Sequence, residues 1–331
     1  MFITVGIVAY NEENVLNHIL EDICNQDYPK KQIEVVLIDS MSSDQTYVLM
    51  ERFQKDHSEF RNVRVLKNPK RKLASGWNIL IDVAEGDAII RIDAHATVPV
   101  DFIRKNVECL KSGEDICGGP RPNIAEENTA WQRTLLLAEA SIFGSSIADY
   151  RRDSEKKYVK SLFHGAYRKE VFQNVGKYNE SLGRTEDNEM HYRMRQKGYR
   201  LCYDPEIRSF QMARSTLRKM CKQKFGNGYW VALTMKVCPK CISIYHFVPF
   251  AFVVAILLTT FLSWLGISVF SKIMWILYGI VAVLMSLVAV QGTKKSIFQF
   301  LLPIIFLVLH ISYGVGSVVG FIRLPFWNEK Y

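Results

Sequence analysis

The stretch "GDAIIRIDAHATVPV", residues 86–100, predicts the end of a buried strand and the beginning of a polar site. Its apolar half suits a strand covered on both faces, and it closes on Asp93 and His95 before Pro99 breaks the pattern. Side chains alternate along a strand, so these two groups project to the same side of the backbone. The question is what a carboxylate and an imidazole hold there.

Strand and helix patterns alternate upstream of this stretch. Strands are expected at 3–10, 33–40, 62–68 and 87–93, with amphipathic helices at 14–26, 47–57 and 74–86 between them. Such alternation predicts an α/β fold with a doubly wound, mostly parallel sheet. Ligands of these sheets bind beyond the carboxyl ends of the strands.

Polar groups follow several of the expected strands. Asn11 and Glu12 come after the first, Asp39 after the second, and Asp93 with His95 after the fourth. Oxygen and imidazole ligands beside a diphosphate suit Mg²⁺ or Mn²⁺, which neutralises a diphosphate leaving group. The alternative is local: Asp93 caps a turn and His95 hydrogen-bonds nearby. The chain has neither GxGxxG after the first strand nor GxxxxGK[ST], so dinucleotide-binding and P-loop interpretations lack support.

A second acidic motif lies in "GRTEDNEMHYRMRQKGYRL", residues 183–201. Acidic residues at the start of a helix often do no more than complement the helix dipole. The functional interpretation makes Asp187 a general base that takes a proton from an acceptor hydroxyl.

The last third of the sequence is far more apolar than the rest. Runs at about 246–270, 273–290 and 297–322 each approach or exceed the roughly 20 apolar residues that a membrane-spanning helix needs. We therefore expect a soluble domain over 1–235 and a membrane domain over 236–331. The amino terminus has neither the basic flank of a signal peptide nor the length of a span, and flanking lysines favour a cytoplasmic head on the cell membrane.

The net charge of +9 fits a head that works near an anionic membrane surface on phosphorylated substrates. No nucleic-acid-binding signature accompanies it, so nucleic acid is not an expected partner. Seven scattered cysteines indicate reduced thiols. A basic amphipathic helix is expected near 214–235, just before the first span; it either attracts anionic lipid or, through Arg214 and Arg218, grips the diphosphate of a lipid-linked acceptor.

Four of these motifs together resemble family 2 glycosyltransferases, inverting enzymes with the GT-A fold. "IVAYNEE" (7–13) is similar to the first nucleotide-binding loop of that family and "IDSMSSDQT" (38–46) to the second. "WNILIDVAEGDAIIRIDAHA" (77–96) resembles the stretch leading to the Asp-x-Asp metal motif, and "TEDNE" (185–189) the catalytic motif. The resemblance implies a Rossmann-like GT-A domain followed by transmembrane helices.

Within the family, "IDAHA", "FHGAYRKEVFQNVGKYNE" (163–180) and "HISYGVGSVVGF" (310–321) resemble bacterial exopolysaccharide glucosyltransferases of the succinoglycan type. This likeness implies a UDP-sugar donor, UDP-glucose above all, an undecaprenyl-diphosphate-linked acceptor and a role in exopolysaccharide or capsule synthesis. His95 departs from the pattern, because many members have a second Asp at that position.

The resemblance also implies roles for individual residues. Donor binding would use Tyr10, Glu12, Asp39, Asn78 and Asp93; the metal would be held by Asp93 and His95; the base would be Asp187; and the acceptor would meet Gly165, Glu186, Arg214, Arg218, Gln223 and Trp230. Gly165 also fits a plain turn. His310, Tyr313, Gly314 and Gly316 are expected to pack helices.

Three alternatives stay open. A transferase that uses a bare polyprenyl monophosphate as acceptor would have the same donor site. A processive synthase would carry Gln-x-x-Arg-Trp where this chain has "QKFGNGYW" (223–230). A non-enzymatic scaffold of a glycan-assembly complex would have to place Asp39, Asp93 and Asp187 together without a cation, which is costly.

Overall fold

The computed structural model describes residues 1–125, 129–144 and 155–328. The chain divides into two compact units, the first comprising Met1–Pro122 and Asp149–Met212 and the second Asn123–Ala148 and Ala213–Tyr331. This division differs from the expected boundary after residue 235. The reason is that helix α8 (Leu217–Val237) packs along α11 (Leu302–Arg323), so it belongs with the apolar carboxyl-terminal helices.

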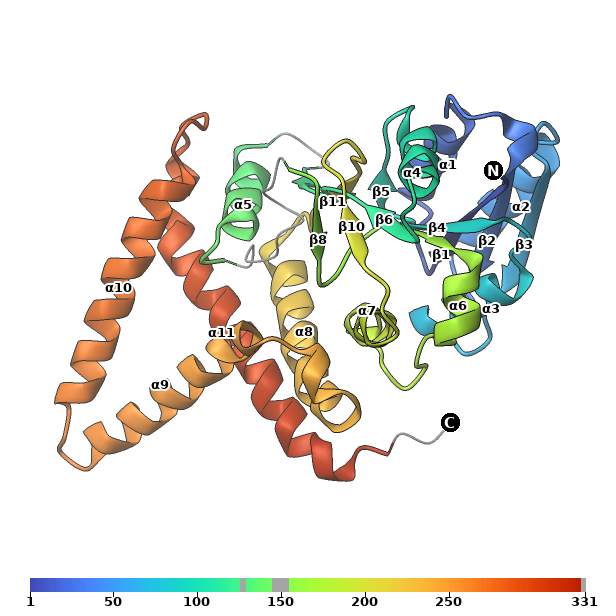
Figure 1. Cartoon of the computed structure of the whole chain (residues 1–331). Coiled ribbons are helices and arrows are strands. Elements are labelled where there is room, and N and C mark those ends of the chain that lie inside the picture. The colour runs from blue at the N-terminus through green and yellow to red at the C-terminus, as the bar shows by residue number, and fades with distance from the viewer. Residues whose placement is uncertain (126–128, 145–154, 329–331) are drawn as a thin grey trace. The chain divides into compact units, whose positions relative to one another are not determined.

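The first unit is built on an eight-stranded sheet in the order β3-β2-β1-β4-β9-β6-β10-β8 (Figure 1). Its strands are β1 (Ile3–Ala9), β2 (Ile33–Asp39), β3 (Asn62–Lys67), β4 (Ala88–Asp93), β6 (Ile116–Gly118), β8 (Lys157–Val159), β9 (Ala166–Arg168) and β10 (Leu201–Tyr203). Strands β3, β2, β1 and β4 are mutually parallel, and β6 is parallel to β10. Strand β9 is antiparallel to both β4 and β6, and β8 to β10. The predicted α/β fold with a mostly parallel sheet is confirmed.

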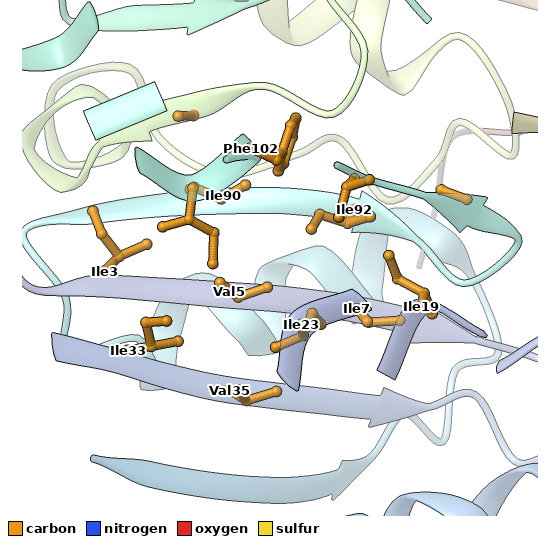
Figure 2. Close-up of a cluster of buried hydrophobic side chains, with 14 of the residues drawn as sticks. Ile3, Val5, Ile7, Ile19, Ile23, Ile33, Val35, Ile90, Ile92 and Phe102 are labelled. Atoms are coloured by element: carbon orange, nitrogen blue, oxygen red, sulfur yellow. The ribbon is translucent and has the colours of Figure 1, made fainter. Parts of the chain in front are cut away.

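Helices cover both faces of this sheet. On one face, α1 (Leu16–Cys24), α2 (Thr46–Asp56) and α4 (Phe102–Lys111) bury their apolar side chains against alternate residues of β1, β2 and β4. Figure 2 shows part of this cluster, including Ile19 and Ile23 of α1 beside Val5 and Ile7 of β1. The other face is covered by α3 (Leu73–Val83), α6 (Lys169–Val175) and α7 (Glu186–Gln196).

One glycine lets α3 lie close to the sheet. A Cβ on Gly6 of β1 would come within 1.9 Å of Leu80 Cδ1 on α3. A side chain at position 6 would force the buried Leu80 side chain to move. Helix α3, which also carries Trp77 and Asn78, therefore packs closely on β1 at this point.

The four parallel strands bring distant residues to one edge. In register, Ala9 of β1 is opposite Asp39 of β2, and Val8 is opposite Asp93 of β4. The polar groups expected beyond the first, second and fourth strands therefore share the carboxyl edge of the sheet. Beyond it, β5 (Ala96–Thr97) pairs antiparallel with β11 (Phe210–Met212).

Among the described residues, the second unit is mainly helical and includes the short strand β7 (Asn123–Ile124). Its described α-helices are α5 (Ala130–Ala140), α8, α9 (Val248–Trp264), α10 (Val269–Ala289) and α11 (Figure 1). Three stretches, Ile244–Trp264, Val269–Ala289 and Ile297–Phe326, are long and apolar enough to cross a membrane. The three predicted spans are thus found, although the first ends at Trp264 and not at residue 270. Gly266 ends it, with a φ of +94° that a side chain would oppose.

Glycines of α11 allow its close contacts with α8 and α9. A Cβ on Gly316 would lie 2.1 Å from the Phe225 carbonyl oxygen of α8, and one on Gly314 would lie 2.2 Å from that of Pro249 on α9. Small residues let apolar helices approach at backbone distance. These contacts agree with the packing role that we expected for both glycines.

Candidate active site

The loops after β1 and β2 are tied together by hydrogen bonds. Asn11, at a φ of +54°, accepts a hydrogen bond from the Ser43 N–H through Oδ1 at 2.8 Å. The Glu12 N–H donates to Thr46 Oγ1 at 2.8 Å, and the Gln45 N–H donates to Glu13 Oε2 at 2.9 Å. The two loops therefore form one rim. Tyr10 stands on it with 52 % of its surface exposed.

Asp39 ends β2 at this rim and is almost fully buried. Both of its carboxylate oxygens share the Ser42 N–H, at 3.2 and 3.3 Å. A carboxylate has about four lone-pair positions, so one shared donor leaves capacity for further hydrogen bonds. Asp39 is therefore a fixed acceptor at the end of the strand.

Asp93 ends β4 and contacts a buried histidine. Its Oδ2 lies 3.3 Å from His164 Nε2, while the other ring nitrogen of His164 lies 3.0 Å from Ser209 Oγ. Burial alone would raise the pKa of Asp93, but its close contact with His164 and the nearby His95 and Arg121 lower it overall. Asp93 is thus an ionised, oriented carboxylate.

His95 joins three segments of the chain. Its Nε2 lies 2.7 Å from Gln211 Nε2 on β11, and its Nδ1 lies 3.5 Å from Glu12 Oε1. The Gln211 amide nitrogen can only donate, so this hydrogen bond requires Nε2 of His95 to accept. Direct metal coordination by His95 would have to displace one of these partners.

The carboxylates at this edge suit a divalent cation. Mg²⁺ in proteins is held by one or two carboxylates together with substrate phosphates, and Mn²⁺ also accepts imidazole. Asp93 offers such an oxygen and His95 such a nitrogen. The donor set therefore fits the predicted metal, with Asp93 as the better-placed ligand.

Asp187 lies in the first turn of α7 and is paired with a buried arginine. Arg91 Nη1 is 2.6 Å from Asp187 Oδ1 and also donates to the Tyr178 hydroxyl. The guanidinium lies 4.3 Å from the centroid of the Trp77 ring and 4.9 Å from that of Tyr178. Arg91 precedes Asp93 by two residues on β4, so the pair brings Asp187 to the strand that carries Asp93.

Glu186, next to Asp187, is almost fully buried. Burial and then the charge of Asp187 raise the pKa of Glu186 to about 8, and Asp93 adds to the effect. Glu186 is therefore protonated at pH 7 and can donate a hydrogen bond, whereas Asp187 has Arg91 as its ion-pair partner. Neighbouring carboxyl groups in different environments are a frequent arrangement of acid and base groups in enzymes.

Acid sensitivity of the first unit should originate partly at His191 on α7. This ring is buried between Tyr167 Oη at 2.8 Å and Ser161 Oγ at 3.0 Å, and burial lowers its pKa to about 4 from an ordinary 6.5. As the pH falls, this histidine is protonated in the unfolded chain before it is protonated in the folded protein. The contribution of neutral His191 to stability is therefore complete above pH 6.5 and is lost as the pH falls towards 4. At about 1.4 kcal/mol per pKa unit, going from pH 7 to pH 5 should cost about 2 kcal/mol. Denaturant unfolding of wild type and His191→Gln at both pH values tests this; an equal pH effect in the two proteins contradicts it.

Two residues predicted to bind substrate have structural partners. The Asn78 amide donates to the Tyr178 carbonyl at 2.9 Å and to Glu180 Oε1 at 3.0 Å, and Asn78 Oδ1 accepts from the Tyr178 N–H. Asn78 thereby fixes the segment whose tyrosine contacts Arg91. A Cβ on Gly165 would lie 3.0 Å from Tyr167 Oη, which gives this glycine a packing reason beside its expected role at the acceptor.

The remaining acceptor residues lie in the second unit. Arg218 is exposed on α8, and Arg214 precedes this helix. Gln223 Oε1 is buried with no hydrogen-bond partner among the described residues. The Trp230 ring lies 6.2 Å from that of Trp327 and 5.8 Å from that of Tyr229. Lys224 of α8, a helix expected to present a basic face, is instead buried. Its Nζ lies 3.8 Å from Glu139 Oε1.

Sequence reasoning assigned no role to Arg91, His164, Tyr178 or Gln211. Arg91 had a detectable signal, because a charged residue inside an apolar strand two positions before Asp93 must share its side. His164 also precedes a glycine and adopts a φ of +45°. The partners of these residues are far away along the chain, which no local pattern reveals.

The mostly parallel sheet with carboxylates at its carboxyl edge is the arrangement expected of a GT-A glycosyltransferase, and the comparisons with known proteins agree with this class. Residues 4–176 match the model of glycosyl transferase family 2, and the chain belongs to this family. The family resemblance and the prediction of an enzyme are confirmed.

Two curated relatives and one solved structure illustrate the similarity. A dolichyl N-acetyl-α-D-glucosaminyl phosphate 3-β-D-2,3-diacetamido-2,3-dideoxy-β-D-glucuronosyltransferase of Methanococcus voltae is 28 % identical over 328 residues, 97 % of this chain and 98 % of that relative. The succinoglycan biosynthesis protein ExoA of Rhizobium meliloti is 30 % identical over 197 residues, 59 % of this chain and 58 % of that relative. A mannosyltransferase of Pyrobaculum calidifontis in complex with GDP-Man and Mn²⁺ has the same fold, with a TM-score of 0.58 and 17 % identity over 96 % of this chain and 86 % of that one.

Proposed function

We propose that this glycosyltransferase moves a sugar from a UDP-sugar, with inversion, to a saccharide carried on a polyprenyl diphosphate or phosphate in the cell membrane. The arrangement of Asp187 carries the proposal, because a buried arginine holds this carboxylate beside the strand that ends in Asp93. Further support comes from three helices long enough to span a membrane and from a relative of nearly equal length whose name specifies a dolichyl phosphate-linked sugar. The catalytic unit would face the cytoplasm.

On the donor side, Tyr10, Glu12 and Asp39 would contact the uridine at the rim that the two loops form. Asp93, with His95, would hold Mg²⁺ or Mn²⁺ next to the diphosphate; when bound, this ion neutralises the charge of the departing UDP. His164 keeps the Asp93 carboxylate in place for that contact. UDP-glucose is the donor we favour, with a role in exopolysaccharide or capsule synthesis.

On the acceptor side, Asp187 would accept the proton of the attacking hydroxyl, and the protonated Glu186 would donate a hydrogen bond to the acceptor sugar. Proton removal by a positioned base is worth about 10²- to 10⁴-fold in rate. Gly165 would allow the sugar to approach the backbone. Arg214, Arg218, Gln223 and Trp230 would bind the phosphate-bearing end of the lipid-linked acceptor.

Asp39→Ala should weaken UDP binding about 10- to 100-fold, the value of a charge-assisted hydrogen bond of about 1.5–3 kcal/mol. Asp39→Asn keeps an oxygen that can accept the hydrogen bond from the Ser42 N–H, so the loop should keep its structure. A loss of affinity in this variant then reports the lost contact between the carboxylate and UDP. We expect the Asn variant to lose most of the affinity as well. Calorimetric titration with UDP measures both variants; unchanged affinity in either removes Asp39 from the nucleotide site.

A donor and acceptor screen tests the proposed reaction. Full-length protein in detergent with Mn²⁺ is offered a panel of nucleotide sugars together with polyprenyl diphosphate-sugar, polyprenyl phosphate-sugar or bare polyprenyl phosphate. Mass spectrometry of the lipid products should show a single added hexose on a sugar-bearing lipid. Product on the bare phosphate alone supports the monophosphate transferase, and a polymer supports a processive synthase. Absence of product with every pair, together with intact glycan export by Asp187→Asn cells, supports a scaffold.

A further inference from the structure

A single short segment supports both of the residues expected to hold the metal. Ser209 Oγ is 3.0 Å from Nδ1 of His164, the histidine that contacts Asp93. Two residues further on, Gln211 Nε2 is 2.7 Å from Nε2 of His95. The segment therefore reaches one expected ligand through a histidine and the other directly.

Backbone hydrogen bonds fix Gln211 beside His95. Gln211 is opposite Ala96 in the antiparallel pair of β11 with β5, and the Met212 N–H donates to the His95 carbonyl at 3.0 Å. The Gln211 N–H donates to the Pro122 carbonyl at 3.1 Å. The amide side chain of Gln211 is thus presented to the histidine from a hydrogen-bonded strand.

The contact with Gln211 occupies the lone pair that a metal would need. An imidazole nitrogen binds a metal through its lone pair, and Nε2 of His95 uses this lone pair when it accepts from the Gln211 amide. Turning the amide over would place Oε1 against a protonated Nε2, and a protonated nitrogen binds no metal. In either orientation, a metal has to displace Gln211 before it can use Nε2.

The cost of this displacement differs between ions. Mg²⁺ takes carboxylate, phosphate and water oxygens, whereas transition-metal ions gain more from an imidazole ligand. An Asp-x-His pair with an open imidazole would therefore shift the preference of the site towards such ions. Breaking the hydrogen bond to Gln211 offsets part of this gain, by the about 2- to 10-fold that one net hydrogen bond is worth.

We propose that Gln211 is a metal-specificity residue of the donor site: it competes with the metal for Nε2 of His95 and so lowers the advantage of Mn²⁺ over Mg²⁺. The inference rests on the proposed function, because it concerns the cation that accompanies the UDP-sugar. Gln211 is a positioning residue in this role, since it acts on the metal only through His95.

Metal binding to the full-length protein in detergent with saturating UDP tests this role. Free Mn²⁺ is measured by its electron paramagnetic resonance signal, and competition with Mg²⁺ gives the ratio of the two affinities. Gln211→Leu and Gln211→Met remove the hydrogen bond at similar side-chain volume. We expect both to shift the ratio towards Mn²⁺ about 2- to 10-fold. Modulation of the Mn²⁺ spin echo by directly bound ¹⁴N should be stronger in both variants than in wild type.

Two controls show whether Gln211 acts through the histidine. In a His95→Ala background, Gln211→Leu should leave the ratio unchanged. Gln173→Leu makes the same change at an exposed position of α6 and should also leave it unchanged. An unchanged ratio in both Gln211 variants, an equal shift without His95, or weaker binding of both ions overturns the inference. If wild type bound neither ion in the presence of UDP, the proposed donor site would fail and the inference with it.

Discussion

Asp187→Asn is expected to lower kcat about 10²- to 10⁴-fold while UDP binding stays within a factor of about two, because the amide cannot take the proton of the acceptor hydroxyl. The substitution keeps an oxygen that can accept the hydrogen bond from Arg91, which now holds Oδ1 at 2.6 Å. The geometry of α7 should therefore survive. Steady-state kinetics with the lipid acceptor, together with titration of UDP, measures both quantities.

Glu189→Gln is the matched control for this variant. Glu189 is on the same helix two residues further on, and its carboxylate is paired with Arg193 at 2.6 Å. Its change should leave kcat of the folded protein within about twofold, because Glu189 has no part in the proposed transfer; since the carboxylate is buried against Arg193, the change should lower stability. If Asp187→Asn retained wild-type turnover, or lost UDP affinity as strongly as turnover, Asp187 would not be the base.

Arg91→Met is the second change with a large expected effect. Removing one partner of a buried ion pair typically costs about 3–5 kcal/mol of stability, because the remaining charge is left without compensation. Arg91 is 8 % exposed and contacts Asp187, Tyr178 and Trp77, so we expect this loss together with a strong fall in kcat. The stability is measured by denaturant unfolding of the purified protein, with the release of bound UDP as the signal.

The double variant Arg91→Met with Asp187→Asn separates the two effects. It removes both charges, so stability should recover substantially while turnover stays as low as in Asp187→Asn. Arg104→Met serves as the exposed control: its ion pairs with Asp27 and Glu108 lie at the surface, where solvent screens them, and the loss of stability should be small. Equal costs for Arg91→Met and Arg104→Met, or an unchanged kcat in Arg91→Met, would show that Arg91 does not hold the base in position.

The packing of helix α8 is a feature that the sequence did not predict. The helix near 214–235 carries an apolar and basic pattern that predicts an interfacial helix before the membrane domain. In the structure, Gly228 of this helix faces the Tyr313 carbonyl oxygen of α11, 2.0 Å from where a Cβ would be, and Lys224 is buried near Glu139. The pattern identified the helix but not its packing partner, because a backbone contact between helices leaves little trace in hydropathy.

The sequence by itself determined the alternation of β1 to β4 with α1 to α3, the three apolar spans, and the placement of Asp39, Asp93 and His95 after strands. These features depend on hydrophobic periodicity over a few residues, which local sequence contains. Tertiary structure alone decided that Arg91 holds Asp187, 96 positions away, and that His164 orients Asp93. Those pairs form where burial makes an unpaired charge too costly to leave alone, and that condition depends on packing across the whole unit.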